Sequence, residues 1–330
     1  MEKQPFISAL IVTRNEKEYI EKSLVSLITQ TYPKDRYEIL IIDGMSDDGT
    51  REIVQRIRAQ YQDNMQIQML DNPKYLLASG WNIGIKRSQG DYVVRIDAHA
   101  EVSSEFLQKS MDTILAFNDA VCVGGKLITK SNDNDIVSLV LSSPFGVGNS
   151  SFRVSDTAGY TDTAVYGLYK KEIFDKVGYF NESYERNQDI ELHSRIRKYG
   201  GKFYFNPEII STYYARNSVK KMLKQANGNG KWNMVLLKNR ESALSIRHLI
   251  PFIFVIFLLI SSIGGLKKKN IWQVELGVII LHLFCGLSAA IKKTKRLKDI
   301  IRMPFLFIAL HTAYGIGYLG GILKKINTED

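Results

Sequence analysis

The sequence predicts an α/β fold with a mainly parallel sheet, followed by a C-terminal α-helical membrane region. Two observations support this prediction. Apolar runs of strand length alternate with helical segments over residues 6–96, and long apolar segments occupy residues 249–323. Continuous apolar strands that alternate with helices are typical of a parallel sheet covered on both faces.

The elements of the first region follow in order along the chain. Four apolar runs predict strands at 6–12, 37–43, 67–70 and 92–96. Helical periodicity predicts helices between them, carrying Ile20, Leu24, Leu27 and Ile28, then REIVQRIRAQY, then WNIGIKRSQG. Ligands of such sheets bind at the carboxyl ends of the strands. At those ends the sequence places the polar segments TRNE, DGMSDDGT and DAHA.

The last part of the chain contains much longer apolar segments. Segments 249–266, 271–291 and 303–323 are each close to the roughly 20 apolar residues that a membrane crossing needs. Lysine clusters flank them. A soluble helical domain is the alternative, but segments that are apolar on every face fit a membrane better. Gly317 and Gly321 form a GxxxG pattern that can pack helices.

We expect three parts in the chain. They are a catalytic domain at 1–232, a basic linker at 233–248 and membrane-associated helices at 249–330. The apolar start of the chain is too short for a signal peptide and lacks a small-residue cleavage pattern. The protein is therefore expected at the cell membrane, with the first domain facing the cytoplasm.

Charge and cysteine content exclude several classes of protein. The net charge is +10, and residues 246–330 contribute +8 of it, through twelve Lys and Arg against four Asp and Glu. Basic residues beside apolar runs predict anionic membrane lipids as the partner, and no nucleic acid. Cys122 and Cys285 lie far apart without CxxC spacing, which excludes a disulfide framework or a zinc-thiolate site.

The segment RIDAHA offers a candidate metal site. If the strand continues through it, Asp97 and His99 point to the same side, because successive strand residues alternate between faces. Magnesium sites often use one or two protein ligands and share the rest with phosphate and water. The imidazole shifts the preference toward Mn²⁺. The alternative is a strand edge without a ligand.

Two other segments carry candidate functional residues: DGMSDDGT and the segment around Asp189. Asp43, at a strand end, could accept hydrogen bonds from a base or ribose; a plain solvated turn is the alternative. A later helix begins after Asn187, and its expected buried face carries Leu192, Ile196 and Tyr199. Asp189 falls in its first turn. There it is either a general base or a carboxylate that the helix dipole stabilises.

Four segments together resemble a known family. In order and spacing, SALIVTRNE, YEILIIDGMSDDGT, GDYVVRIDAHA and RNQDIELHSRIRKYGG resemble the family 2 glycosyltransferases, over about residues 6–232. The resemblance implies the GT-A fold, a Rossmann-like nucleotide-binding domain. It also implies inverting transfer of a sugar from a nucleotide-diphosphate donor.

The resemblance also assigns roles to individual residues. Thr13, Asn15, Glu16 and Asp43 would line the nucleotide site. Asp97 and His99 stand where the family's DxD motif binds metal and diphosphate, and Asp189 stands at the catalytic base. Two departures, DAH for DxD and Gln188 before the base, resemble the succinoglycan-type exopolysaccharide glucosyltransferase branch.

Downstream, RNSVKKMLKQANGNGKW resembles the family's Gln/Arg-rich segment that ends in Trp. By this resemblance Arg216, Gln225, Lys231 and Trp232 would close over the diphosphate and the acceptor. A basic amphipathic helix that leads into the membrane region explains the same residues equally well.

The expected activity is therefore that of a membrane-associated hexosyltransferase that depends on Mn²⁺ or Mg²⁺. It would move a sugar from a UDP-sugar donor to a hydroxyl of a polyprenyl-diphosphate-linked saccharide in extracellular polysaccharide biosynthesis. Three alternatives stay open: a polyprenyl-phosphate sugar synthase, a sugar-nucleotide pyrophosphorylase and an inactive membrane scaffold.

Overall fold

A computed structural model describes residues 4–130, 136–148, 150–214, 218–239 and 244–324. The chain forms two compact units. The first contains Met1–Ile128 and Ser151–Tyr214, and the second contains Thr129–Ser150 and Ala215–Asp330. Helix α10 (Val219–Lys238) runs through the predicted boundary at residue 232. The three-part domain division therefore stays a proposal.

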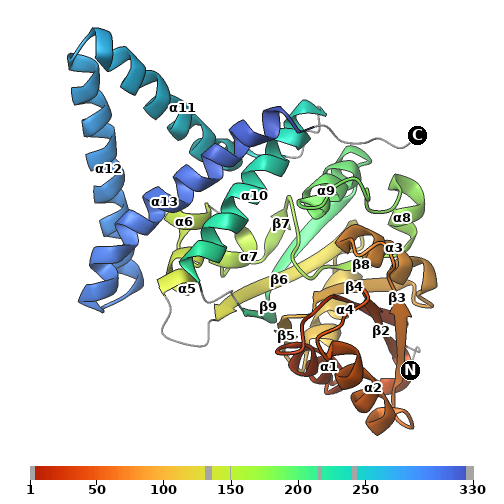
Figure 1. Ribbon diagram of the computed structural model, residues 1–330. Helices are drawn as coiled ribbons and strands as arrows, with labels where there is room; N and C mark the ends of the chain where they lie inside the picture. The colour runs from red at the N-terminus through yellow and green to blue at the C-terminus, as the bar shows by residue number, and fades with distance from the viewer. Residues whose placement is uncertain (1–3, 131–135, 149, 215–217, 240–243, 325–330) are drawn as a thin grey trace. The chain divides into compact units, whose positions relative to one another are not determined.

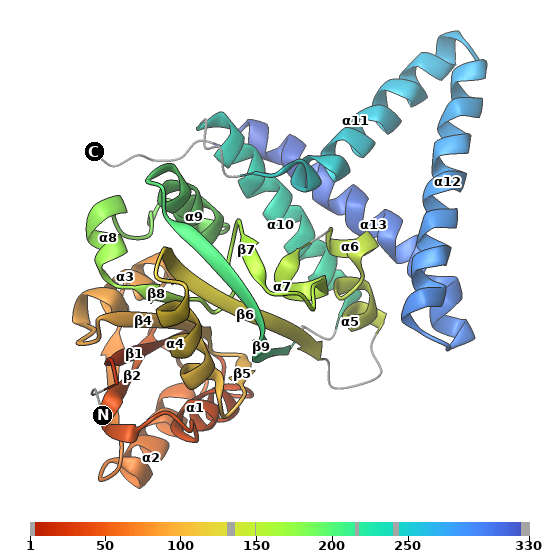
Figure 2. The same cartoon turned by 180° about the vertical axis from the view of Figure 1, so that it is seen from behind.

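The first unit is built on a mixed sheet (Figures 1 and 2), whose described strands have the order β3-β2-β1-β4-β8-β6-β9-β5, with β7 beside β9. Strand β1 runs parallel to β2 and β4, and β2 runs parallel to β3. Strand β8 is antiparallel to both β4 and β6. The strands are β1 (Ile7–Thr13), β2 (Tyr37–Asp43), β3 (Gln66–Asp71), β4 (Tyr92–Asp97), β5 (Ala100–Val102), β6 (Ala120–Lys130), β7 (Gly159–Thr161), β8 (Leu168–Lys170) and β9 (Lys202–Tyr214).

Helices cover both faces of this sheet. Along β1, Ile7, Ala9 and Ile11 pack into one apolar cluster, while Leu10 and Val12 pack into a second. All seven residues of β1 are buried, which explains why its sequence is apolar without alternation. The helices and the 3₁₀ turn are α1 (Ile20–Ile28), η1 (Lys34–Arg36), α2 (Thr50–Tyr61), α3 (Leu77–Arg87), α4 (Phe106–Ala116), α7 (Ser151–Val154), α8 (Glu172–Val177) and α9 (Gln188–Lys198). The predicted α/β class is confirmed.

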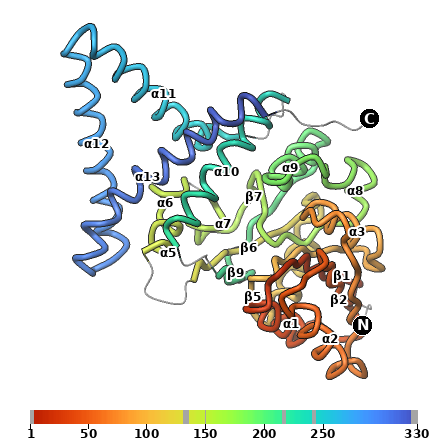
Figure 3. Tube along the Cα trace, viewed as in Figure 1, coloured from red at the N-terminus to blue at the C-terminus, as the bar shows by residue number. Residues whose placement is uncertain are grey.

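The second unit is helical. Its elements are α5 (Ile136–Leu141), α6 (Pro144–Val147), α10 (Val219–Lys238), α11 (Ile246–Lys267), α12 (Asn270–Lys293) and α13 (Leu297–Ile322). By length and composition, α11, α12 and α13 could each cross a membrane. They correspond to the three apolar segments predicted from the sequence. Figure 3 traces α10 alongside α13, with α11 and α12 connected as a hairpin.

Candidate active site

The carboxyl ends of three neighbouring strands bring the first candidates together. Thr13 at the end of β1 pairs in register with Asp43 at the end of β2, and Val12 pairs with Asp97 at the end of β4. Since these strands are parallel, Thr13, Asp43 and Asp97 lie at the same edge of the sheet. The Thr13 hydroxyl is buried, and no described residue forms a hydrogen bond with it.

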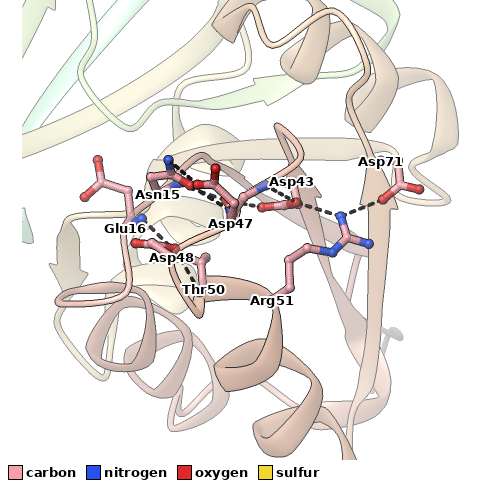
Figure 4. Close-up of polar contacts among 9 residues, drawn as sticks. Asn15, Glu16, Asp43, Asp47, Asp48, Thr50, Arg51 and Asp71 are labelled. Atoms are coloured by element: carbon pink, nitrogen blue, oxygen red, sulfur yellow. Dashed lines mark hydrogen bonds and ion pairs between the residues drawn. The ribbon is translucent and has the colours of Figure 1, made fainter.

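The loops after β1 and β2 are joined by hydrogen bonds (Figure 4). The Asn15 amide donates to Asp47 at 2.9 Å, and the Asp47 backbone N–H donates back to Asn15 Oδ1 at 3.1 Å. The Glu16 backbone N–H donates to Thr50 Oγ1 at 2.9 Å. Asn15 has φ 54°, in the left-handed region that Asn tolerates better than most residues. The loops TRNE and DGMSDDGT therefore form one structure.

The side chain of Asp43 is buried and is held in place by hydrogen bonds. Its side chain is 1% exposed and accepts hydrogen bonds from the Ser46 hydroxyl at 2.6 Å and from Arg51 Nη1 at 2.7 Å. Arg51 also pairs with Asp71 at 2.8 Å. Hydrogen bonds to Asp71 and Asp43 raise the pKa of Arg51. The sequence prediction included Asp43 and missed Arg51, although Arg51 stands at the start of the helix that follows the loop.

One premise of the predicted metal site is wrong. Strand β4 ends at Asp97, and His99 lies in the turn before β5, because antiparallel pairing with β9 begins at Ala100. Strand alternation therefore does not orient the two side chains. Instead, the Tyr166 hydroxyl contacts Asp97 Oδ2 at 3.3 Å, and Glu16 Oε1 lies 3.2 Å from His99 Nδ1.

The role of Asp97 and His99 as metal ligands stays a prediction. Glu16 beside Nδ1 favours the tautomer with its proton on Nδ1, which places the imidazole lone pair on Nε2, the usual arrangement for a metal-binding histidine. Across the described part of the chain, no group of three or more His, Cys, Asp and Glu side chains could hold a metal. In the predicted site, Asp97 and His99 would supply two ligands, and phosphate and water would supply the rest.

Asp189 lies in the first turn of α9, as predicted. Its Oδ1 accepts a hydrogen bond from its neighbour's backbone N–H at 2.9 Å, and its side chain is 38% exposed. The predicted buried face is only partly right: Leu192 and Ile196 are fully buried, whereas Tyr199 is 58% exposed. The helix has already ended at Lys198, so Tyr199 does not continue the buried stripe.

Arg95 lies between the strand end that carries Asp97 and the helix that carries Asp189. The sequence prediction missed it. Its Nη2 lies 3.8 Å from Asp189 Oδ2, and it sits two residues before Asp97 in β4. The guanidinium lies 5.1 Å from the Trp81 ring. Burial alone would lower the pKa of Arg95, but nearby groups, including Tyr169, Asp189 and Asp97, raise it above its usual value. A charged residue inside the apolar run YVVRID was the signal.

The comparison with known families decides which family the chain belongs to. Residues 8–178 match the family described as "Glycosyl transferase family 2". The chain is a family 2 glycosyltransferase. This confirms the family predicted from the four sequence segments.

Relatives of this glycosyltransferase include two curated proteins. A dolichyl N-acetyl-alpha-D-glucosaminyl phosphate 3-beta-D-2,3-diacetamido-2,3-dideoxy-beta-D-glucuronosyltransferase from Methanococcus voltae is 31% identical, over 98% of this chain and 99% of its own. The succinoglycan biosynthesis protein ExoA from Rhizobium meliloti (strain 1021) is 27% identical, over 74% of each chain. The predicted relation to the succinoglycan branch is thereby confirmed.

A solved structure shows the same fold. The mannosyltransferase PcManGT from Pyrobaculum calidifontis, in complex with GDP-Man and Mn²⁺, has a TM-score of 0.63 at 17% identity. The match covers 95% of this glycosyltransferase and 88% of PcManGT. At this identity the likeness establishes the fold, and the predicted GT-A architecture agrees with it.

His193 anchors the helix that carries Asp189. It is fully buried one turn further along α9, with Nδ1 2.8 Å from the Thr163 hydroxyl and Nε2 2.7 Å from the Tyr169 hydroxyl. Burial lowers the pKa of His193 to about 3. The imidazole is therefore neutral at physiological pH, and it ties α9 to its neighbours without serving as an acid or base.

We expect this buried histidine to make the stability of the glycosyltransferase depend on pH. The folded-state pKa of His193 is about 3, against about 6.5 when unfolded. Its stabilisation is thus complete above pH 6.5 and falls as the pH drops toward 3, by about 1.4 kcal/mol per pH unit. Urea unfolding followed by Trp81 fluorescence, in a Trp232→Phe and Trp272→Phe background, measures this. A His193→Asn variant should lose stability less steeply between pH 7 and pH 5. If stability falls equally steeply with pH in both proteins, His193 is not the source of this pH dependence.

The remaining predicted residues belong to the second unit. Gln225, Lys231 and Trp232 lie on α10, while Arg216 falls outside the described residues. Trp232 is 3% exposed, and the Lys324 ammonium lies 4.2 Å from the centre of its ring. Their assignment to the diphosphate and the acceptor stays a prediction.

Proposed function

We propose that this protein is an inverting glycosyltransferase that moves a sugar from a UDP-sugar to a hydroxyl of a lipid-linked saccharide in extracellular polysaccharide biosynthesis. One observation carries the proposal: Arg95 contacts Asp189 and lies two residues before Asp97. The nearness of the candidate base to the strand end that carries the candidate metal ligand supports a direct displacement.

The residues present have complementary roles in such a displacement. Asp97 and His99 would hold a divalent cation, Mn²⁺ or Mg²⁺, which neutralises the leaving diphosphate. Asp189 accepts the proton of the attacking hydroxyl, and its partly exposed side chain leaves it accessible to an acceptor. Arg95, whose Nη2 lies 3.8 Å from Asp189 Oδ2, would orient this carboxylate. Direct attack on the opposite side from the leaving group inverts the sugar, without a covalent enzyme intermediate.

The relatives support the donor and acceptor classes. PcManGT was solved with GDP-Man and Mn²⁺, and GalNAc-T7, with a TM-score of 0.51, was solved with UDP, GalNAc and Mn²⁺. The archaeal relative acts on a dolichyl-phosphate-linked sugar, and the rhizobial one belongs to succinoglycan biosynthesis. These relatives support a lipid-linked saccharide as acceptor. We propose a polyprenyl-diphosphate-linked one, used at the cell membrane by a catalytic unit that faces the cytoplasm, with anionic lipids beside the basic segments of the chain.

A polyprenyl-phosphate sugar synthase is the rival within the class. Its acceptor already carries a charge and needs no general base, whereas Asp189 beside Arg95 favours a base. A pyrophosphorylase gains no support from the family assignment. An inactive scaffold would not require Asp97, His99 and Asp189 together.

The proposal is tested with detergent-solubilised protein and a panel of nucleotide sugars. We expect release of UDP from a UDP-sugar when a lipid-linked saccharide and Mn²⁺ or Mg²⁺ are both present. Omission of the acceptor is the control for hydrolysis of the donor. Absence of acceptor-dependent release from every member of the panel, with either metal, would rule out the proposed transfer.

A further inference from the structure

We propose that α11 and α12 form the membrane-inserted hairpin and that α13 is not a third crossing. Helix α13 instead stays on the side of the catalytic unit, bound to α10. This inference rests on the proposed membrane association, and on no step of the sugar transfer. The number of membrane crossings is then two instead of three, and both ends of the hairpin lie on the same face of the membrane.

The backbones of α10 and α13 touch along a row of glycines. A Cβ atom on Gly230 would lie 2.0 Å from the Tyr314 carbonyl oxygen, and one on Gly317 would lie 2.0 Å from that of Asn227. A Cβ on Gly321 would lie 2.4 Å from the carbonyl oxygen of Lys231. The predicted GxxxG at Gly317 and Gly321 therefore packs a helix of the same chain.

Polar side chains fasten the same two helices. The Asn227 amide donates to the Ala313 carbonyl at 3.1 Å. The Lys238 ammonium donates to the Ile322 carbonyl at 2.8 Å. The α10–α13 pair is thus joined over the last three turns of α13.

Helix α10 is too polar to enter a bilayer with α13. Its charged side chains are all lysines: Lys220, Lys221, Lys224, Lys231 and Lys238. Four of them are exposed and Lys231 is partly exposed. Lysine is among the residues that cost most to place in hydrocarbon. Because α10 covers α13 along its length, a crossing by α13 would carry these lysines into the membrane.

A second segment holds α13 independently. Residues Met303, Phe307 and Leu310 share an apolar cluster with Val137 and Val140 of α5. Helix α5 belongs to segment 129–150, which both begins and ends next to residues of the catalytic unit in the chain. That segment has no apolar stretch long enough to cross. It therefore remains on the catalytic side, and the α13 face that it covers remains there as well.

Helices α11 and α12 differ from α13 in how little protein covers them. In their most apolar windows, 17% of α11 and 11% of α12 is buried, against 33% of α13. Their lengths of 22 and 24 residues correspond to about 33 and 36 Å at 1.5 Å per residue, enough for a hydrocarbon core of about 30 Å. Figures 1 and 2 show the two helices leaving the α10–α13 pair as a hairpin.

Both ends of the hairpin return to α13. Gly315 of α13 lies against Pro251 near the start of α11, and Gly286 near the end of α12 lies against Pro304 of α13. The six basic residues that follow the membrane part of α12 then stay on the catalytic side, against three lysines at the tip of the hairpin, in keeping with the positive-inside rule. They are Lys292, Lys293, Lys295, Arg296, Lys298 and Arg302.

Cysteine labelling in sealed membranes tests the inference. In a Cys285→Ser background, one variant carries Thr294→Cys after α12, and another carries a cysteine appended to the C-terminus. A membrane-impermeant maleimide is added to right-side-out and to inverted vesicles. Labelling of both positions from the same face is expected. Labelling from opposite faces would establish three crossings and overturn the inference.

A matched pair of glycine variants tests the helix contact itself. Asn227→Cys and Ala313→Cys should form an oxidative cross-link in native membranes. Gly317→Val should reduce this cross-link at least fivefold, whereas Gly320→Val should not, because a Cβ atom on Gly320 meets nothing within 4 Å. Equal cross-linking in both variants would contradict the packing. Acceptor-dependent UDP release, measured in the same vesicles, separates a failure of this inference from a failure of the proposed transfer.

Discussion

Replacing Asp189 by Asn should reduce kcat for sugar transfer by about 10²–10⁴-fold, the range that general-base catalysis contributes. The amide keeps the size of the side chain but cannot accept the acceptor's proton. Donor binding should change little, because none of the residues that we assign to the nucleotide or its diphosphate lies on α9. Steady-state kinetics with saturating acceptor, together with calorimetric titration of UDP, distinguishes the two effects.

Glu52→Gln is the matched control for this substitution. Glu52 is exposed and, like Asp189, lies in the first turn of a helix. If the helix dipole were the whole role of Asp189, both variants would lose only about 0.3–1 kcal/mol of stability and keep their activity. Near-wild-type turnover by Asp189→Asn would remove the base assignment and favour the polyprenyl-phosphate sugar synthase.

Replacing Asp97 by Ala should weaken Mn²⁺ binding in the presence of UDP by at least about 100-fold, more than loss of a group behind a metal ligand typically costs. The carboxylate is one of only two protein ligands in the proposed site, so its loss leaves the cation dependent on the diphosphate and His99. Electron paramagnetic resonance of Mn²⁺ measures the affinity directly, and UDP release measures the accompanying loss of turnover.

His99→Asp provides the comparison for the metal site. It restores a two-carboxylate pair and should move the metal preference from Mn²⁺ toward Mg²⁺, because an imidazole favours the softer ion. Transfer that continues in a chelator and is unaffected by Asp97→Ala would exclude a metal role for this pair.

Most of the fold could be predicted from local patterns in the sequence. Strands that are covered on both faces must be apolar throughout, so the run containing Ile7, Leu10 and Ile11 could be recognised as a buried parallel strand without any structure. Asp43, Asp97 and Asp189 could likewise be found from their positions at strand ends and in a first helical turn. Each of these signals lies within a few residues of the side chain that it identifies.

Contacts between distant residues could not be predicted in this way. The pairing of Arg95 with Asp189 joins residues far apart in sequence, and neither segment contains information about the other. The expectation that one strand orients Asp97 and His99 to the same side failed because His99 lies in a turn. After that turn, β5 pairs with β9, a strand more than a hundred residues later.

The sequence by itself determined the family, the α/β class and the apolar character of the last three helices, because these depend on side chains close together in the chain. Only the tertiary structure decided which of those helices is covered by protein. Helices α11 and α13 are both long and apolar, but α13 carries Gly317 and Gly321 against the lysine-rich α10, and α11 has no such contact along most of its length. Hydropathy measures what a segment can bury, whereas packing determines whether protein or lipid buries it.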